Sequence, residues 1–145
     1  MLVNGSGGPI EGWHKVLKPL SEFATVVAYN RPGMGRSAKP QMPQTGVHMA
    51  TSLHALLEHA DLPPPYVLVG HSLGGLIVNL FARSYPAEVA GVVLLEATSP
   101  DDVGTLDAYE GRLQRILRRL LARVMPPDPL AETEHLATTV SELKS

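Results

Sequence analysis

Three short apolar runs stand out along the chain, at Ala24–Tyr29, Tyr66–Val69 and Val89–Leu95. Each run is nearly continuous and rich in β-branched residues. This pattern is typical of strands that are buried on both faces of a parallel sheet. We therefore expect these runs to form strands of one parallel sheet, connected by the segments between them.

Apolar residues at helical spacing occupy the connecting segments. The spacing predicts helices over Trp13–Phe23 with an interruption at Pro19, over Thr45–Ala60, and from Leu73 to the residue before Pro86. Strand and helix thus alternate, which favours right-handed crossovers. The expected fold is a doubly wound, mostly parallel α/β sheet with flanking helices.

The last part of the chain has a different pattern. A long helix is predicted over Leu106–Met125, with an apolar stripe on one side and arginines elsewhere: Arg112, Arg115, Arg118, Arg119 and Arg123. The favoured interpretation is an amphipathic helix whose basic face is solvated. The alternative is that this face attracts an anionic substrate or a membrane surface. A last amphipathic stretch covers Leu130–Leu143.

Composition excludes several classes of function. The formal charge is −2, which gives no general attraction to nucleic acid, and there is no cysteine for a disulfide or a thiolate metal site. Histidines and carboxylates do not occur at metal-ligand spacing. No apolar run approaches the roughly 18 residues of a membrane span, and no signal peptide precedes the first strand. The sequence predicts a cytoplasmic protein with no metal or other cofactor.

The strongest chemical motif is Gly70-His71-Ser72-Leu73-Gly74-Gly75, which directly follows an apolar strand pattern and opens a helical one. Strand, Gly-x-Ser-x-Gly and helix together are typical of a nucleophile elbow, which holds a serine hydroxyl clear of the backbone. A serine needs such geometry, and a base, to become a nucleophile. Ser72 is therefore the candidate nucleophile.

With this motif and three other segments in the same order, the chain resembles the α/β-hydrolase superfamily. Leu2–Gly8 looks like the family's third strand and oxyanion loop, Tyr29–Ser37 like the loop after the fourth strand, and Val92–Glu96 like the sixth strand. The resemblance covers Leu2 to Asp102. It implies a partial α/β-hydrolase core over residues 1–102 and a helical cap-like segment over 103–145.

The resemblance also assigns an oxyanion hole. Its two donors would be the backbone N–H groups of Leu73, next to the nucleophile, and of Ser6, after Asn4-Gly5. Many relatives have His-Gly where this chain has Asn-Gly, but backbone donation does not need the histidine side chain. The loop around Arg31 is interpreted as structural.

The acid and the base of a triad are less evident. Glu96, at the end of the sixth strand, is the candidate acid, with Asp101 and Asp102 as weaker candidates; the alternative is that Glu96 is only a polar strand end. A family triad runs serine, acid, histidine along the chain. Only His135 follows Ser72, and it lies in an amphipathic segment. We therefore expect a chain truncated at both ends.

Two functions remain open on the sequence alone. The first is a serine hydrolase that acts on a small ester, amide or related acyl substrate. The second is a non-catalytic or inactive hydrolase-like fragment that binds a ligand or a partner. A nucleic acid or membrane partner is not expected, and the oligomeric state is not indicated by any pattern.

Overall fold

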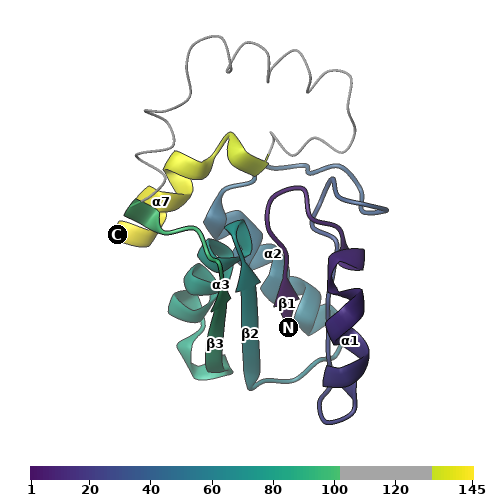
Figure 1. Cartoon of the computed structure of the whole chain (residues 1–145). Coiled ribbons are helices and arrows are strands. Elements are labelled where there is room, and N and C mark those ends of the chain that lie inside the picture. The colour runs from purple at the N-terminus through teal and green to yellow at the C-terminus, as the bar shows by residue number, and fades with distance from the viewer. Residues whose placement is uncertain (102–131) are drawn as a thin grey trace.

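A computed structural model describes residues 1–101 and 132–145. Its elements are, in order, β1 (Leu2–Val3), η1 (Ile10–Trp13), α1 (His14–Ser21), α2 (Gly46–His59), β2 (Tyr66–His71), α3 (Leu73–Ser84), η2 (Pro86–Glu88), β3 (Val89–Leu95) and α7 (Leu136–Lys144). The strands form one parallel sheet in the order β1-β2-β3, with β2 in the centre (Figure 1). The predicted parallel α/β sheet with flanking helices is confirmed, as a partial fold of three strands.

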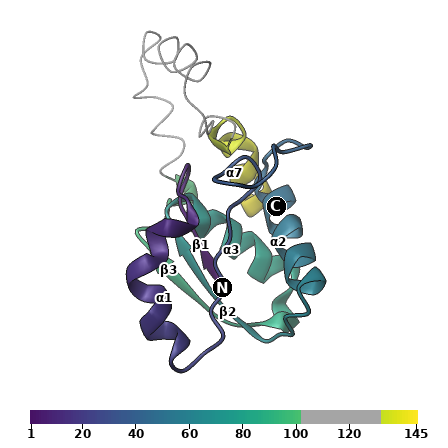
Figure 2. The ribbon, with the colours of Figure 1, turned by 90° about the vertical axis from the view of Figure 1, so that its right-hand side faces the viewer.

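Helices flank both faces of this sheet. Figure 2 shows α1 on one side of the strands and α2 and α3 on the other. The core lies on the side of α2 and α3, where Leu53, Leu68 and Phe81 are completely buried. Because β2 and α3 share this core, packing fixes the turn that joins them.

The predicted strand Ala24–Tyr29 is reduced to a single parallel bridge between Ala28 and Leu2, reinforced by the Leu2 N–H that donates to the Val27 carbonyl at 2.8 Å. The physical reason is the shortness of β1. The segment Ala24–Tyr29 can pair only with the two residues of β1, Leu2 and Val3, before the chain turns at Asn4. No regular ladder of hydrogen bonds therefore forms.

Burial of β3 also differs from the prediction. Val92, Val93, Leu94 and Leu95 are 40 to 52% exposed, whereas a strand buried on both faces was expected. Within the described residues, β3 pairs with β2 on one side only. Its apolar run therefore indicates a strand, as predicted, but not the degree of its burial.

The C-terminal helix α7 completes the start of α2. Three backbone N–H groups at that helix end have side-chain acceptors: Gly46 N donates to Thr139 Oγ1 at 2.8 Å, Val47 N to Glu142 Oε2 at 3.0 Å, and His48 N to Thr45 Oγ1 at 3.3 Å. The first N–H groups of a helix lack partners within the helix, and a carboxylate there also meets the positive end of the helix dipole. Residues of α7 thus cap a helix that precedes them by more than 90 positions.

The C-terminal predictions are tested only in part. The stretch Leu130–Leu143 overlaps the observed helix α7, which ends one residue later at Lys144, whereas the predicted helix Leu106–Met125 and its arginines lie outside the described residues. The division into 1–102 and 103–145 stays a prediction. In the described ranges, no helix has the length and apolar character needed to cross a membrane, and no three potential ligand side chains are grouped to hold a metal ion.

We predict that Thr139→Val lowers the free energy of unfolding by about 1–3 kcal/mol, because the buried Gly46 N–H loses its acceptor. Thr139→Ser keeps the hydroxyl and removes one methyl group, so it costs roughly 1 kcal/mol or less. Urea denaturation of the two variants measures the difference. Equal destabilisation by Val and Ser would show that the hydroxyl does not cap α2.

Candidate active site

Ser72 lies in a strained turn between β2 and α3. Its backbone has φ 50° and ψ −119°, a conformation that costs a residue other than glycine about 1–3 kcal/mol. Three hydrogen bonds hold it: Ser72 N donates to the Leu95 carbonyl at 3.2 Å, and the Ser72 carbonyl accepts from Gly75 N at 2.9 Å and Thr98 N at 3.2 Å. The strain is therefore maintained by the ends of the neighbouring strand and helix, as the elbow motif predicts.

Two glycines of the motif make this turn sterically feasible. A Cβ on Gly70 would lie 2.5 Å from the Gly74 carbonyl oxygen. A Cβ on Gly74 would overlap the carbonyl oxygen of Val3 and come within 2.7 Å of that of Asn4. Gly70 accepts only a hydrogen because α3 begins in direct contact with β2, and Gly74 because α3 begins in direct contact with the end of β1.

The glycine-rich loop Asn4–Gly8 passes directly beside Ser72. A Cβ on Gly5 would lie 3.0 Å from Ser72 Cβ and 3.1 Å from His71 Nδ1. The structure thus brings together the two blocks that sequence analysis associated with a nucleophile and an oxyanion loop. Leu73 is the first residue of α3, so its N–H belongs to the unpaired helix start. The donor roles of Ser6 and Leu73 stay predictions.

A pocket of about 380 Å³ opens at this loop. Its lining includes Asn4, Gly5 and Ser6 of the loop together with Trp13, His71 and Leu95. Trp13 Nε1 is buried, and in residues 1–101 and 132–145 nothing accepts its hydrogen. The pocket is small, partly apolar and adjacent to Ser72 through Gly5.

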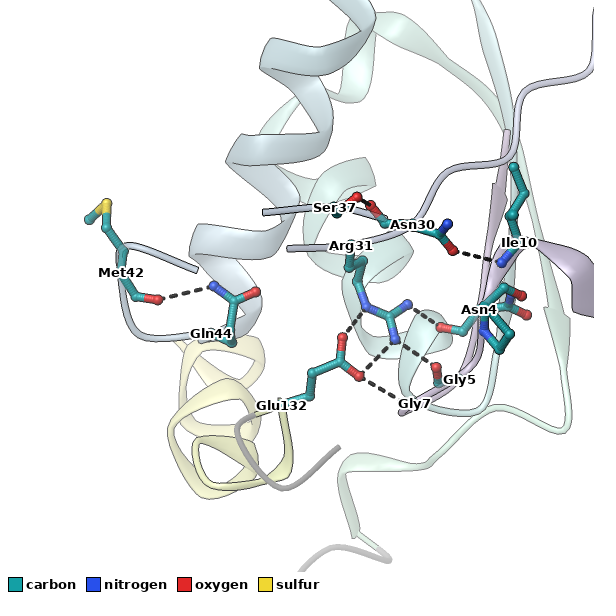
Figure 3. A network of polar contacts seen from close by, with 11 residues as sticks. Asn4, Gly5, Gly7, Ile10, Asn30, Arg31, Ser37, Met42, Gln44 and Glu132 are labelled. Atoms are coloured by element: carbon teal, nitrogen blue, oxygen red, sulfur yellow. Dashed lines mark hydrogen bonds and ion pairs between the residues drawn. The ribbon is translucent and has the colours of Figure 1, made fainter. Parts of the chain in front are cut away.

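Behind the loop lies a buried ion pair that sequence analysis missed. Arg31 and Glu132 are 2% and 1% exposed, and Arg31 Nε lies 2.6 Å from Glu132 Oε1 (Figure 3). Arg31 also donates to the carbonyls of Asn4 and Gly5, at 2.5 and 2.6 Å, and Glu132 accepts the N–H of Gly7 at 2.9 Å. Removal of one partner would leave an uncompensated buried charge, which typically costs about 3–5 kcal/mol.

The same pair affects its neighbour Tyr29. Burial raises the pKa of Tyr29 to about 12; the positive charge of Arg31 opposes this rise and the negative charge of Glu132 adds to it. Tyr29 is therefore neutral at physiological pH. The Tyr29 side chain is thus an uncharged neighbour of the ion pair.

The candidate acids lie in different parts of the structure. Glu96 follows β3 directly, with φ 42°, at the same sheet edge as Ser72. No hydrogen bond in the described part of the chain joins Glu96 to Ser72 or to a histidine ring. Asp101 is on the surface, 3.6 Å from Lys144 Nζ, and Asp102 lies outside the described residues.

No described histidine acts as a visible partner of Ser72. His135 precedes α7 and its carbonyl accepts from Thr139 N, but within 1–101 and 132–145 its ring makes no hydrogen bond to Ser72. His54 stacks on Tyr85 with ring centroids 3.9 Å apart and contacts Glu88 at 3.1 Å. The role of His135 as a base stays a prediction, and His54 has a packed, polar environment of its own.

The chain is similar in sequence to several curated proteins. The chain is 30% identical over 125 residues to the dihydrolipoyllysine-residue acetyltransferase component of the acetoin cleaving system of Cupriavidus necator, covering 86% of this chain and 33% of that protein. It is 27% identical over 130 residues to a (lyso)-N-acylphosphatidylethanolamine lipase of Homo sapiens, covering 82% of this chain and 38% of the lipase. It spans well under half the length of the curated relatives it matches.

A solved structure of a carboxylesterase from Nitrososphaera gargenis has the same fold, with a TM-score of 0.68. Its sequence is 22% identical, and the match covers 86% of this chain and 44% of the esterase. Two other solved structures match this chain with TM-scores of 0.64 and 0.65. The profile of the family described as "alpha/beta hydrolase fold" matches residues 1–133. The chain therefore belongs to the alpha/beta hydrolase fold family.

Proposed function

We propose that this chain carries the nucleophile and oxyanion hole of a serine hydrolase acting on a small ester, amide or related acyl substrate. The observation that carries the proposal is Ser72 in its strained turn, with Gly5 of the glycine-rich loop against it. Such strain persists where the surrounding structure over-determines it, and it is concentrated at functional sites. The two backbone segments meet where a nucleophile and an oxyanion donor are needed.

The chemistry follows from these positions. Ser72 Oγ attacks the acyl carbon and forms a tetrahedral intermediate, whose negative oxygen accepts from the N–H groups of Leu73 and Ser6. One donor of this kind is worth about 2.7–4 kcal/mol in a studied protease. The base takes the Ser72 proton as Oγ attacks and gives it to the alcohol or amine that leaves as the intermediate collapses. Water, deprotonated by the same base, then releases the acyl group from Ser72, whose oxygen regains the proton. Glu96 and His135 are the candidates for the acid and the base.

Two further observations support an acyl substrate of modest size. The pocket of about 380 Å³ beside Gly5 and Ser6 is large enough for a short acyl group. The acetyltransferase component, the lipase and the carboxylesterase that resemble this chain have names that describe acyl chemistry. The chain spans less than half of each, so the substrate of the whole protein is part of the proposal.

One observation favours a second function, a hydrolase-like module that binds a ligand without turnover. In the residues described, neither a carboxylate nor a histidine ring makes a hydrogen bond to Ser72. A serine without a base is a weak nucleophile. Ligand binding that is insensitive to removal of the Ser72 hydroxyl would support this second function.

We predict that a fluorophosphonate probe adds one phosphonyl group to this chain and that Ser72→Ala abolishes the addition. Intact-mass spectrometry measures it. Ser52→Ala is the matched control, because Ser52 is an exposed serine on α2 and its loss should leave labelling unchanged. Labelling that persists in Ser72→Ala would contradict the assignment of the nucleophile.

We also predict that Gly74→Ala reduces labelling at least about tenfold and destabilises the fold by about 1–3 kcal/mol, because the new Cβ forces α3 away from Val3 and Asn4. Gly91→Ala is the control, since a Cβ there has no atom within 4 Å. Labelling rate and thermal midpoint are measured for both variants. If the two behave alike, the close approach of α3 to β1 does not shape the site.

A further inference from the structure

We propose that Arg31 and Glu132 are positioning residues that fix the direction of the Ser6 N–H, and thereby assemble the oxyanion hole. The inference rests on the proposed function, because it concerns the same site. Neither residue touches the reacting atoms in this scheme. They act through the backbone of the loop Asn4–Gly8, which Figure 3 shows around the Arg31 guanidinium.

The argument begins with one peptide group. The carbonyl of Gly5 and the N–H of Ser6 belong to the same planar trans peptide, so they point in opposite directions. Arg31 Nη2 donates to this carbonyl at 2.6 Å. Holding the carbonyl toward Arg31 therefore turns the Ser6 N–H to the opposite side of the peptide. A cation on the carbonyl also polarises the peptide and strengthens its N–H as a donor.

The preceding peptide is held in the same way. Arg31 Nη1 donates to the Asn4 carbonyl at 2.5 Å, so two consecutive carbonyls face one planar guanidinium. The loop contains Gly5, Gly7 and Gly8, and Gly7 has φ 66°. Glycine peptides rotate with little steric resistance. Within the loop, Gly8 N donates to the Gly5 carbonyl at 3.1 Å and Asn4 Nδ2 donates to the Pro9 carbonyl at 2.6 Å. The Arg31 guanidinium adds to this internal turn an external constraint of fixed geometry.

Glu132 makes that constraint rigid. Its oxygens accept from Arg31 Nε at 2.6 Å and Nη2 at 3.0 Å, which is the two-point arrangement that orients a guanidinium. Glu132 Oε2 also accepts the N–H of Gly7 at 2.9 Å. The ion pair therefore binds the loop on both sides of Ser6: Arg31 binds the carbonyls of Asn4 and Gly5 before it, and Glu132 binds the N–H of Gly7 after it.

The test compares Arg31→Lys and Glu132→Gln with the unaltered chain. Lysine keeps the charge but has no planar fork for two carbonyls and a carboxylate. Glutamine keeps an acceptor for Gly7 and removes the charge. Arg83→Lys is the matched control, because Arg83 also donates to a backbone carbonyl, that of Leu143 at 2.5 Å, away from the loop. If a single variant fails to fold, Arg31→Met with Glu132→Met removes both charges together.

Two measurements are made on each folded variant. Amide hydrogen exchange by NMR reports the order of the loop at Gly7 and Gly8, with Leu68 in β2 as the reference. The kinetics of labelling by a fluorophosphonate give a maximal rate and an apparent binding constant. Loss of an oxyanion donor's alignment should lower the maximal rate about tenfold or more, and should leave the binding constant within about twofold.

The proposal expects faster exchange at Gly7 and Gly8 together with the lower maximal rate, in Arg31→Lys and in Glu132→Gln but not in Arg83→Lys. Unchanged loop exchange, or a disordered loop with an unchanged labelling rate, would overturn it. If the unaltered chain is not labelled at Ser72, the proposed function fails. Exchange at Gly7 and Gly8 then still decides whether the ion pair orders the loop.

Discussion

The site depends on a close approach of three backbone segments: the end of β1, the turn at Ser72 and the start of α3. Gly74 lies so near the Val3 carbonyl that any side chain there would overlap it, and Gly5 reaches the side chain of Ser72. Side chains fill space between elements in most of a protein interior. Here backbone meets backbone, so the positions of polar groups are set by the path of the chain itself.

The C-terminal segment supplies hydrogen-bond acceptors to backbone N–H groups in the first part of the chain. Thr139 and Glu142 accept the first N–H groups of α2, and Glu132 accepts that of Gly7. In each case an oxygen from the last 14 residues meets an amide from the first 50. Buried amides without acceptors are costly. The C-terminal segment thus contributes polar partners as well as the apolar contact of Leu143.

Local patterns predicted the fold where the physics is local. Apolar periodicity located α2 and α3. The Gly-x-Ser-x-Gly pattern identified the turn between β2 and α3, where Ser72 has a positive φ. The prediction of a strand over Ala24–Tyr29 was wrong, because a regular strand also needs a neighbour of sufficient length and β1 has only two residues. Pattern alone also overestimated the burial of β3, since burial depends on what packs beside a strand.

The partner of Arg31 was beyond sequence reasoning for a related reason. Glu132 stands in a part of the chain without a recognisable motif, and nothing local distinguishes it from Glu134. Only the folded chain shows that one of these carboxylates is buried against an arginine and the other exposed. A signal that links distant positions, such as paired changes among relatives, is the kind that would have found it.

The separation of that ion pair affects when the site is completed during synthesis. Arg31 and Glu132 are 101 residues apart, and a chain is synthesised from its N-terminus. The strands, α2, α3 and Ser72 are all made before Glu132 appears. Until then the carboxylate that pairs with Arg31 in the folded chain is absent, and an unpaired charge resists burial. The contacts that Glu132 makes to Arg31 and Gly7 therefore form only after Ser72 has been synthesised.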